Sequence, residues 1–164
     1  MSLNLVLFMG ENSARIIVIG PSGAGKSTFI NAILGEGKEA KKTQMIEFKE
    51  NYVDIPGEYI EIRRFNYIVI NMAIESSLII VIQDATSDKP SLPAGFCAVF
   101  QKPVVGIINK IDLKEAKIDR AEKFLIQAGV MRENIFAVSA KTREGIAEVK
   151  RMIKKLLCML MESH

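Results

Sequence analysis

The stretch GPSGAGKST, residues 20–28, constrains the fold of this chain more than any other feature. It follows an apolar run, RIIVIG, and precedes FINAIL, which has helical character. The spacing of Gly20, Gly25, Lys26 and Ser27 matches the full pattern of a phosphate-binding loop between a strand and a helix. Glycines permit positive φ angles and bring backbone N–H groups close to an anion, and the helix directs its positive dipole end at the same place. The pattern therefore predicts a nucleoside triphosphate site.

Two side chains of this loop have expected roles of their own. Lys26 is expected to reach the β and γ phosphates, and the Ser27 hydroxyl is expected to ligate Mg²⁺. A glycine-rich turn that matches by accident is the alternative, and residue frequencies make it rare. The residues expected around the phosphates are Gly20, Ser22, Gly23, Ala24, Gly25, Lys26, Ser27 and Thr28.

Four apolar runs, RIIVIG, SLIIVIQD, PVVGIINK and NIFAVSA, alternate with segments of helical character. Near-continuous Ile and Val runs are typical of parallel strands that are covered on both faces. Ile46 and Phe48 alternate with Glu47 and Lys49 ahead of YVDI, which predicts an antiparallel hairpin at one sheet edge. We expect an α/β, three-layer P-loop NTPase fold with a mostly parallel, six-stranded sheet and one antiparallel edge strand.

The length of 164 residues suits a single domain, which we expect to span residues 15–164. Residues 1–14 are interpreted as a leader or an appended segment, because their apolar run is too short for a signal peptide or a membrane span. The last segment places Ile146, Val149 and Ile153 on one helical face that should pack on the sheet; a basic membrane-surface helix is the alternative. A net charge of +3 beside 25% charged residues is not the footprint of a nucleic-acid binder. A cytoplasmic location without a transmembrane segment is expected.

The run PVVGIINK ends in NKID, where ligands bind beyond the carboxyl ends of parallel strands. Guanine presents an N1 hydrogen beside a 2-amino group, and the Asp112 carboxylate can accept both hydrogen bonds. Adenine offers neither donor there, so the carboxylate would lose water without compensation. Asn109 is expected to bond the base or to tie neighbouring loops together, and the stem of Lys110 to lie over the ring. The sequence therefore predicts GTP and GDP as ligands.

A second loop, SAK, follows the next strand. The backbone N–H groups of Ser139, Ala140 and Lys141 are expected near guanine O6. Taken alone, SAK is equally consistent with a helix cap. Its order behind the phosphate loop and NKID favours the base contact.

The motif DIPG, residues 54–57, ends the hairpin. Asp54 is expected to hold Mg²⁺ through a water molecule, and the Gly57 N–H to face the γ-phosphate. Thr43, before the hairpin, is the candidate for a second hydroxyl ligand of Mg²⁺, together with Ser27. A plain proline-glycine turn is the alternative.

The ordered set of these motifs resembles Ras-like GTPases of the translation-factor class. The stretches KKTQMIEF, DIPGEYIEIRRF, VIQDAT, PAGF and KPVVGIINKIDL are similar to those of the ethanolamine-utilisation and propanediol-utilisation family called EutP/PduV, and the resemblance covers almost everything from Arg15 onward. It implies a Ras-like G domain in a bacterial cytoplasmic protein that works with catabolic enzymes in protein-shelled microcompartments. A shell or pathway protein is then the expected partner.

Glu58 follows Gly57, where many Ras-like proteins have a glutamine that orients water. A carboxylate there can accept a hydrogen bond from the attacking water but faces a γ-phosphate of the same sign, so slow hydrolysis is expected. The catalytic candidates are Lys26 and Glu58. One of Arg63 and Arg64 is a candidate to neutralise this repulsion or to stabilise the transferring phosphoryl group in cis; a solvated helix face is the alternative. Three functions follow as hypotheses: a GTP-binding switch with slow hydrolysis, a phosphotransferase acting on a small metabolite, and a binding module without turnover.

The segment SLPAGFCAVF leaves room for two or three helical turns before the next strand. Phe96 and Phe100 are expected in the core, with an exposed patch on the sheet face as the alternative.

Overall fold

The computed structural model describes residues 14–35, 37 and 44–163. Nearly all of the segment interpreted as a leader, and the candidate Thr43, lie outside the described residues.

The centre of the molecule is a single six-stranded sheet with the order β2-β3-β1-β4-β5-β6. Its strands are β1 (Ile16–Ile19), β2 (Glu47–Lys49), β3 (Tyr52–Asp54), β4 (Leu78–Asp84), β5 (Val104–Asn109) and β6 (Ile135–Ala137). The β2–β3 pair is antiparallel, with Phe48 opposite Val53, and the other pairs are parallel. The predicted edge hairpin and the mostly parallel sheet are confirmed.

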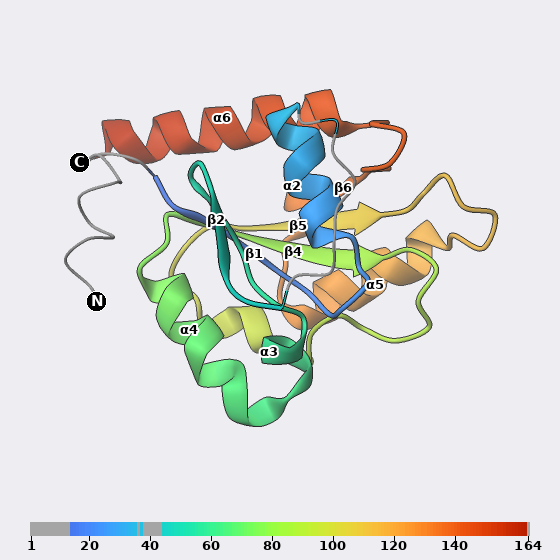
Figure 1. The fold of residues 1–164 in the computed structure, drawn as a ribbon, viewed down its shortest axis with the longest axis horizontal. Helices are drawn as coiled ribbons and strands as arrows, with labels where there is room; N and C mark the ends of the chain where they lie inside the picture. Colours follow the sequence, from blue (N-terminus) through green and yellow to red (C-terminus); the bar gives the residue numbers. More distant parts are fainter. Residues whose placement is uncertain (1–13, 36, 38–43, 164) are drawn as a thin grey trace.

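Helices cover both faces of this sheet and form the outer two of three layers (Figure 1). One layer holds α2 (Lys26–Leu34) and α6 (Ile146–Glu162). The other holds α3 (Glu58–Glu61), α4 (Asn66–Ile74) and α5 (Ile118–Ala128). Single turns of 3₁₀ helix, η1 (Arg63–Phe65), η2 (Phe96–Val99) and η3 (Arg132–Asn134), link these elements.

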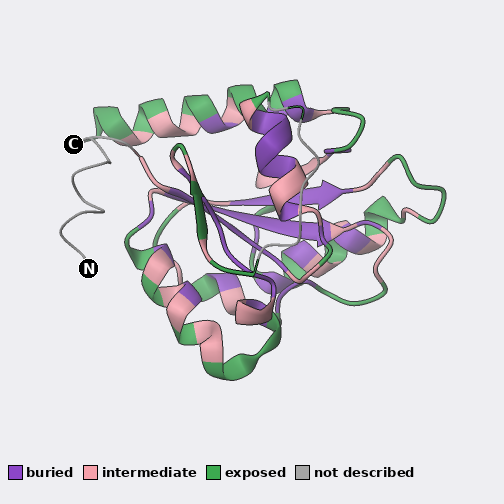
Figure 2. Ribbon diagram, in the orientation of Figure 1, coloured by how far each residue is buried: buried purple, intermediate pink, exposed green. Residues whose placement is uncertain are grey.

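Alternate residues of the strands build the two halves of the core. Ile16 and Val18 pack with α2 and α6, while Ile17 and Ile19 pack with the opposite layer, and all four are fully buried. Figure 2 shows the contrast between the buried central strands and the exposed outer faces of the helices. Each such side chain contributes about 1.5–3 kcal/mol of burial free energy, so both layers hold the strand ends in place.

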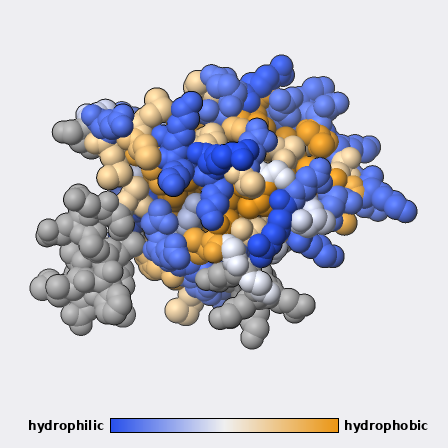
Figure 3. All heavy atoms as spheres, turned by 90° about the horizontal axis from the view of Figure 1, so that it is seen from above, coloured by the Kyte–Doolittle hydropathy of each residue, from blue (hydrophilic) through white to orange (hydrophobic). Residues whose placement is uncertain are grey.

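The C-terminal helix packs on the sheet as expected. Ile146, Val149 and Ile153 are buried against it, while Lys150 and Lys154 are exposed. Figure 3 views the molecule from the side of α2 and α6, where hydrophilic and hydrophobic side chains are interspersed on the surface. None of the helices among the described residues combines the length and apolarity that crossing a membrane requires.

The connection between β4 and β5 contains less helix than the sequence allowed. Instead of two or three turns it has only η2, because Pro90 and Pro93 lack backbone N–H donors and the left-handed Gly95 directly precedes the turn. Phe96 and Phe100 are half-buried, pack against the core and meet edge to face with ring centroids 5.7 Å apart. They therefore join the periphery of the core, as expected.

Candidate nucleotide-binding site

The phosphate loop connects β1 to α2 at the carboxyl edge of the sheet. Gly23 and Gly25 have φ angles of 79° and 93°, which glycine adopts without the cost that a side chain would add. Gly25 is the N-cap of α2, so the positive end of the helix dipole points into the loop. A Cβ atom at Gly25 would also overlap the Asn109 side-chain nitrogen. Glycine is thus required here by both backbone conformation and space.

Lys26 begins α2 and lies folded along its own loop. Its side chain is buried, and Nζ donates a hydrogen bond to the Pro21 carbonyl at 3.0 Å. Burial lowers the pKa of the Lys26 ammonium below its usual range, although the carboxylates of Asp54, Glu61 and Glu58 act in the opposite direction. The Lys26 ammonium would therefore lie close to an anion bound in the phosphate loop.

A hydroxyl and a carboxylate meet at the residue after Lys26. Ser27 Oγ donates a hydrogen bond to Asp54 Oδ2, and Asp54 is completely buried at the end of β3. Both are hard oxygen donors of the kind that Mg²⁺ prefers, so these residues fit the ion. Thr28, the next residue of α2, is half-buried.

The segment after β3 folds back onto the phosphate loop. Gly57 is buried, and a Cβ atom there would overlap the Ser22 nitrogen. The Ser22 N–H donates to Glu61 Oε1 at 2.6 Å. Glu58, the first residue of α3, is half-buried. The DIPG motif and the phosphate loop are therefore in direct contact.

No sequence motif assigns a role to Glu61. Its contact with Ser22 joins residues 39 positions apart, and only the fold-back of α3 brings them together. No local motif marks such a contact in advance.

Asn109, at the end of β5, links two loops. Its Nδ2 donates to the Ala24 carbonyl at 3.0 Å, and its Oδ1 accepts from the Ala140 N–H at 3.0 Å. Asn109 is buried, so both bonds are shielded from water. Of the two roles considered for this residue, the link between neighbouring loops is the one seen in the structure.

Lys110 bridges the phosphate loop and the end of β4. Nζ donates to the Gly23 carbonyl and to Asp84 Oδ2, each at 2.6 Å. Asp84 was not among the candidate residues, although it ends an apolar strand next to the one that ends in Asn109. That adjacency of strand ends is the signal that could have identified it.

Asp112 and the SAK loop are joined by a hydrogen bond. Ser139 Oγ donates to Asp112 Oδ1 at 2.7 Å and accepts from the Thr142 N–H at 3.1 Å. Ser139 is fully buried, whereas Asp112 and Lys141 are exposed. The helix-cap alternative for SAK is not observed, because α6 begins at Ile146 after the N-cap Gly145.

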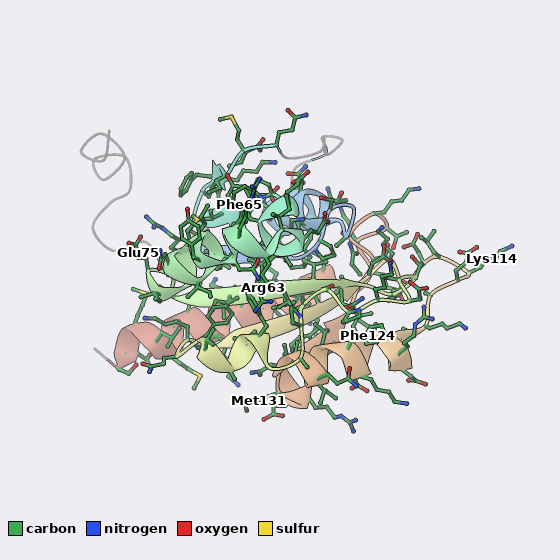
Figure 4. The ribbon with its side chains drawn as sticks, turned by 90° about the horizontal axis from the view of Figure 1, so that it is seen from below. Arg63, Phe65, Glu75, Lys114, Phe124 and Met131 are labelled. Carbon is green, nitrogen blue, oxygen red and sulfur yellow. The ribbon has the colours of Figure 1, made fainter. Side chains whose placement is uncertain are left out.

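The arginine pair lies on the surface. Arg63 and Arg64 are exposed in η1, and the Arg64 guanidinium lies 4.8 Å from the Phe65 ring centroid. Figure 4 shows Arg63 and Phe65 in the layer of α3 and α4, while Lys114 marks the loop beyond β5. This arrangement matches the solvated-face interpretation.

The glycine-rich loop after β1, its lysine and serine, and the loops gathered at the same sheet edge define a P-loop protein with the Ras-like GTPase fold. The crystal structure of a probable GTP-binding protein, engB, shares this fold: it superposes with a TM-score of 0.66 at 20% identity, covering 89% of this chain and 99% of that one.

Within this class the family is also defined. Residues 13–155 match the family described as ethanolamine utilisation - propanediol utilisation (PduV-EutP), and the chain belongs to it. It is 32% identical to the propanediol utilization protein PduV of Citrobacter freundii, over 82% of this chain and 89% of that protein. It is 29% identical to the probable acetate kinase EutP of Escherichia coli, over 82% of this chain and 86% of that protein.

Proposed function

We propose that this chain binds GTP and GDP together with Mg²⁺ and acts as a nucleotide switch with slow GTP hydrolysis in ethanolamine or propanediol utilisation. The observation that carries the proposal is the position of the NKID loop. Through Asn109 and Lys110 it is bonded directly to the phosphate loop, so one ligand can contact both. A nucleotide can contact both loops at once, because its base and its phosphates are joined through one sugar.

Asp112 is the residue we assign to base selection. It is exposed, so a ligand can reach it, and its Oδ1 is oriented by the Ser139 hydroxyl. The carboxylate would accept hydrogen bonds from guanine N1 and the 2-amino group. Ala140 and Lys141 follow Ser139 in the chain, and their N–H groups would donate to guanine O6.

The metal is assigned to Ser27 and Asp54, with Thr43 as the proposed second hydroxyl. When bound, Mg²⁺ would offset the negative charge of the β and γ phosphates. Ser27 and Asp54 come from α2 and β3, so the ion would join the phosphate loop to the DIPG segment.

Ser27→Ala is expected to reduce the dependence of nucleotide binding on Mg²⁺. Loss of a direct oxygen ligand should weaken metal-assisted binding of GTP by about 10-fold or more, in the range seen when groups around a metal are removed. Calorimetric titration with GTP at several Mg²⁺ concentrations measures the effect. Ser163→Ala, at the exposed end of α6, is the matched control. An unchanged Mg²⁺ dependence in Ser27→Ala would count against the metal assignment.

Slow hydrolysis follows from the charges around the loop. Glu58 and Glu61 both lie close enough to act on the Lys26 charge. A γ-phosphate placed against Lys26 would face these two carboxylates, and repulsion between like charges opposes the build-up of charge during phosphoryl transfer. Lys26 would offset part of this repulsion, and Glu58 would orient the attacking water.

The switch is assigned to the contact between α3 and the phosphate loop. Because Gly57 and Glu61 touch the loop at Ser22, a γ-phosphate binding there would compete with the Glu61 carboxylate for the same region. The order of this segment would then differ between the GTP and GDP states. A microcompartment shell or pathway protein, in the cytoplasm or at the compartment, would bind one of these two states in preference to the other.

A second candidate function is phosphoryl transfer to a small carboxylate. It is favoured by a cavity of about 560 Å³ beside the phosphate loop, lined by Ser22, Glu61 and Lys89 among others, and by the name of the Escherichia coli relative. A carboxylate oxygen of acetate would attack the γ-phosphorus as the bond to the β-phosphate oxygen breaks, which yields acetyl phosphate and GDP.

One experiment separates these functions. The purified chain is given GTP with and without Mg²⁺ and with and without acetate, and phosphate, GDP and hydroxylamine-trapped acyl phosphate are followed over time. GTP binding with slow, acetate-independent phosphate release supports the switch. Acyl phosphate formed in step with GDP supports the transferase instead, and absence of turnover over many hours contradicts both enzymatic versions.

A further inference from the structure

The end of β4 holds a carboxylate that the proposed function does not yet use. Asp84 lies beside Asn109 in the parallel register, and its side chain is only 17% exposed. Its Oδ1 accepts hydrogen bonds from the Thr86 N–H at 2.8 Å and the Thr86 hydroxyl at 2.7 Å. Thr86 therefore fixes the orientation of the Asp84 carboxylate through one of its two oxygens.

The other oxygen of Asp84 is committed to Lys110. Oδ2 accepts from Lys110 Nζ at 2.6 Å in an ion pair whose lysine side chain is 31% exposed. Burial would raise the pKa of the Asp84 carboxyl, but the hydrogen bonds from Lys110 and Thr86 and the Lys110 charge outweigh it and hold that pKa below its usual value. The Asp84 carboxyl is thus charged at neutral pH.

Hydrogen bonds also fix the backbone next to Asp84 and Lys110. Ala85 N–H donates to the Asn109 carbonyl at 2.9 Å, and Lys117 N–H donates to the Ala85 carbonyl at 2.8 Å. Arg120 donates to the Thr86 carbonyl at 3.3 Å. The loop that follows Asp84 is therefore fixed to β5 and to α5.

Lys110 itself has a restricted geometry. Its φ angle is 67°, a left-handed conformation that a side chain normally avoids, and its ammonium is held by both Gly23 and Asp84. Its backbone and its ammonium are both fixed, so the aliphatic stem of Lys110 spans the distance between the NKID loop and the phosphate loop. A lysine has about 2 kcal/mol of rotamer entropy to lose, so holding it in advance favours a ligand that packs on the stem.

We propose that Asp84 is a positioning residue for nucleotide binding, which fixes the Lys110 stem as the surface on which the purine ring packs. The proposal rests on the proposed guanine-nucleotide function. It assigns the base, rather than the phosphates, as the part of the ligand that depends on Asp84. Gly23 supplies the second anchor of the same ammonium.

The test uses the full chain, with GTP, GDP and inorganic tripolyphosphate as probes in calorimetric titrations. Asp84→Asn keeps the shape of the side chain and removes its charge. We expect the affinities for GTP and GDP to fall together by roughly 10-fold, the scale of one partly buried ion pair, while the tripolyphosphate affinity stays within about 2-fold. Asp88→Asn, an exposed carboxylate of the same loop, should leave all three unchanged.

A double-mutant cycle shows whether Asp84 acts through Lys110. In a Lys110→Met background, Asp84→Asn should produce no further loss of GTP affinity. Equal losses for tripolyphosphate and GTP, unchanged affinities in Asp84→Asn, or additive losses in the cycle would each overturn the proposal. If Asp84→Asn does not fold, Thr86→Val removes one hydroxyl bond to the carboxylate and should give the same pattern at about 2-fold to 3-fold. Absence of GTP binding by the unaltered chain would instead refute the proposed function.

Discussion

Lys26→Ala is expected to weaken the binding of GTP and GDP by about 100-fold or more. Lys26 is the buried cation of the phosphate loop, and in the free protein its ammonium is held by the Pro21 carbonyl. Removing one partner of a buried charge pair costs about 3–5 kcal/mol, because the remaining charge loses its compensation without regaining water. Calorimetry with GTP and GDP at fixed Mg²⁺ measures the loss.

The control for this change is another lysine replaced in the same way. Lys102 is exposed and precedes β5, at the end of the sheet away from the phosphate loop. The Lys102→Ala variant should therefore bind GTP as tightly as the unaltered chain does. The thermal melting temperatures of both variants show whether the fold is intact. A folded Lys26→Ala variant with full GTP affinity would refute the phosphate-loop assignment.

Asp112→Asn is expected to change base preference from guanine to xanthine. The carboxylate would accept two hydrogen bonds from guanine in the proposed role, and an amide would place its NH₂ group against the guanine 2-amino group. Loss of these charge-assisted bonds should cost about 3 kcal/mol, or about 100-fold in GTP affinity. Xanthine has an oxygen at that position and can accept from the new amide, so xanthosine triphosphate should gain relative to GTP.

Competition between the two nucleotides for a fluorescent analogue measures this reversal. Asp119→Asn, an exposed acidic residue in the first turn of α5, is the matched control and should keep the guanine preference. Because Asp112 is exposed, its replacement should leave the melting temperature nearly unchanged. An Asp112→Asn variant that still prefers GTP would contradict the role assigned to Asp112.

The fold was predictable because its signals are local and repeated. The Ile and Val runs of β1 and β4 are buried on both faces, and burial of this kind leaves a continuous apolar run in the sequence. The alternation of Ile46 and Phe48 predicts the edge hairpin but not its burial, because Phe48 of β2 is exposed. The short η2 turn was less predictable, since the apolar spacing of Phe96 and Phe100 is compatible with a longer helix and only the prolines and Gly95 limit it.

The site was predictable where a motif fixes both residue type and position. The phosphate loop and NKID do so, and the structure places them side by side through Asn109 and Ala24. The contacts of Glu61 and Asp84 were not predicted, because they depend on where separate elements meet in space. Asn109 shows the limit most clearly: its residue type allows both a base contact and a loop link, and only the structure shows the link to Ala140.

The most direct measurement is a competition experiment in which GTP and ATP displace a bound fluorescent guanine nucleotide from the unaltered chain in the presence of Mg²⁺. The carboxylate at Asp112 would lose hydration against adenine without gaining a donor, a penalty of several kcal/mol, so GTP should displace the probe at concentrations about 100-fold or more below those needed for ATP. Equal displacement by GTP and ATP would contradict guanine recognition by this chain.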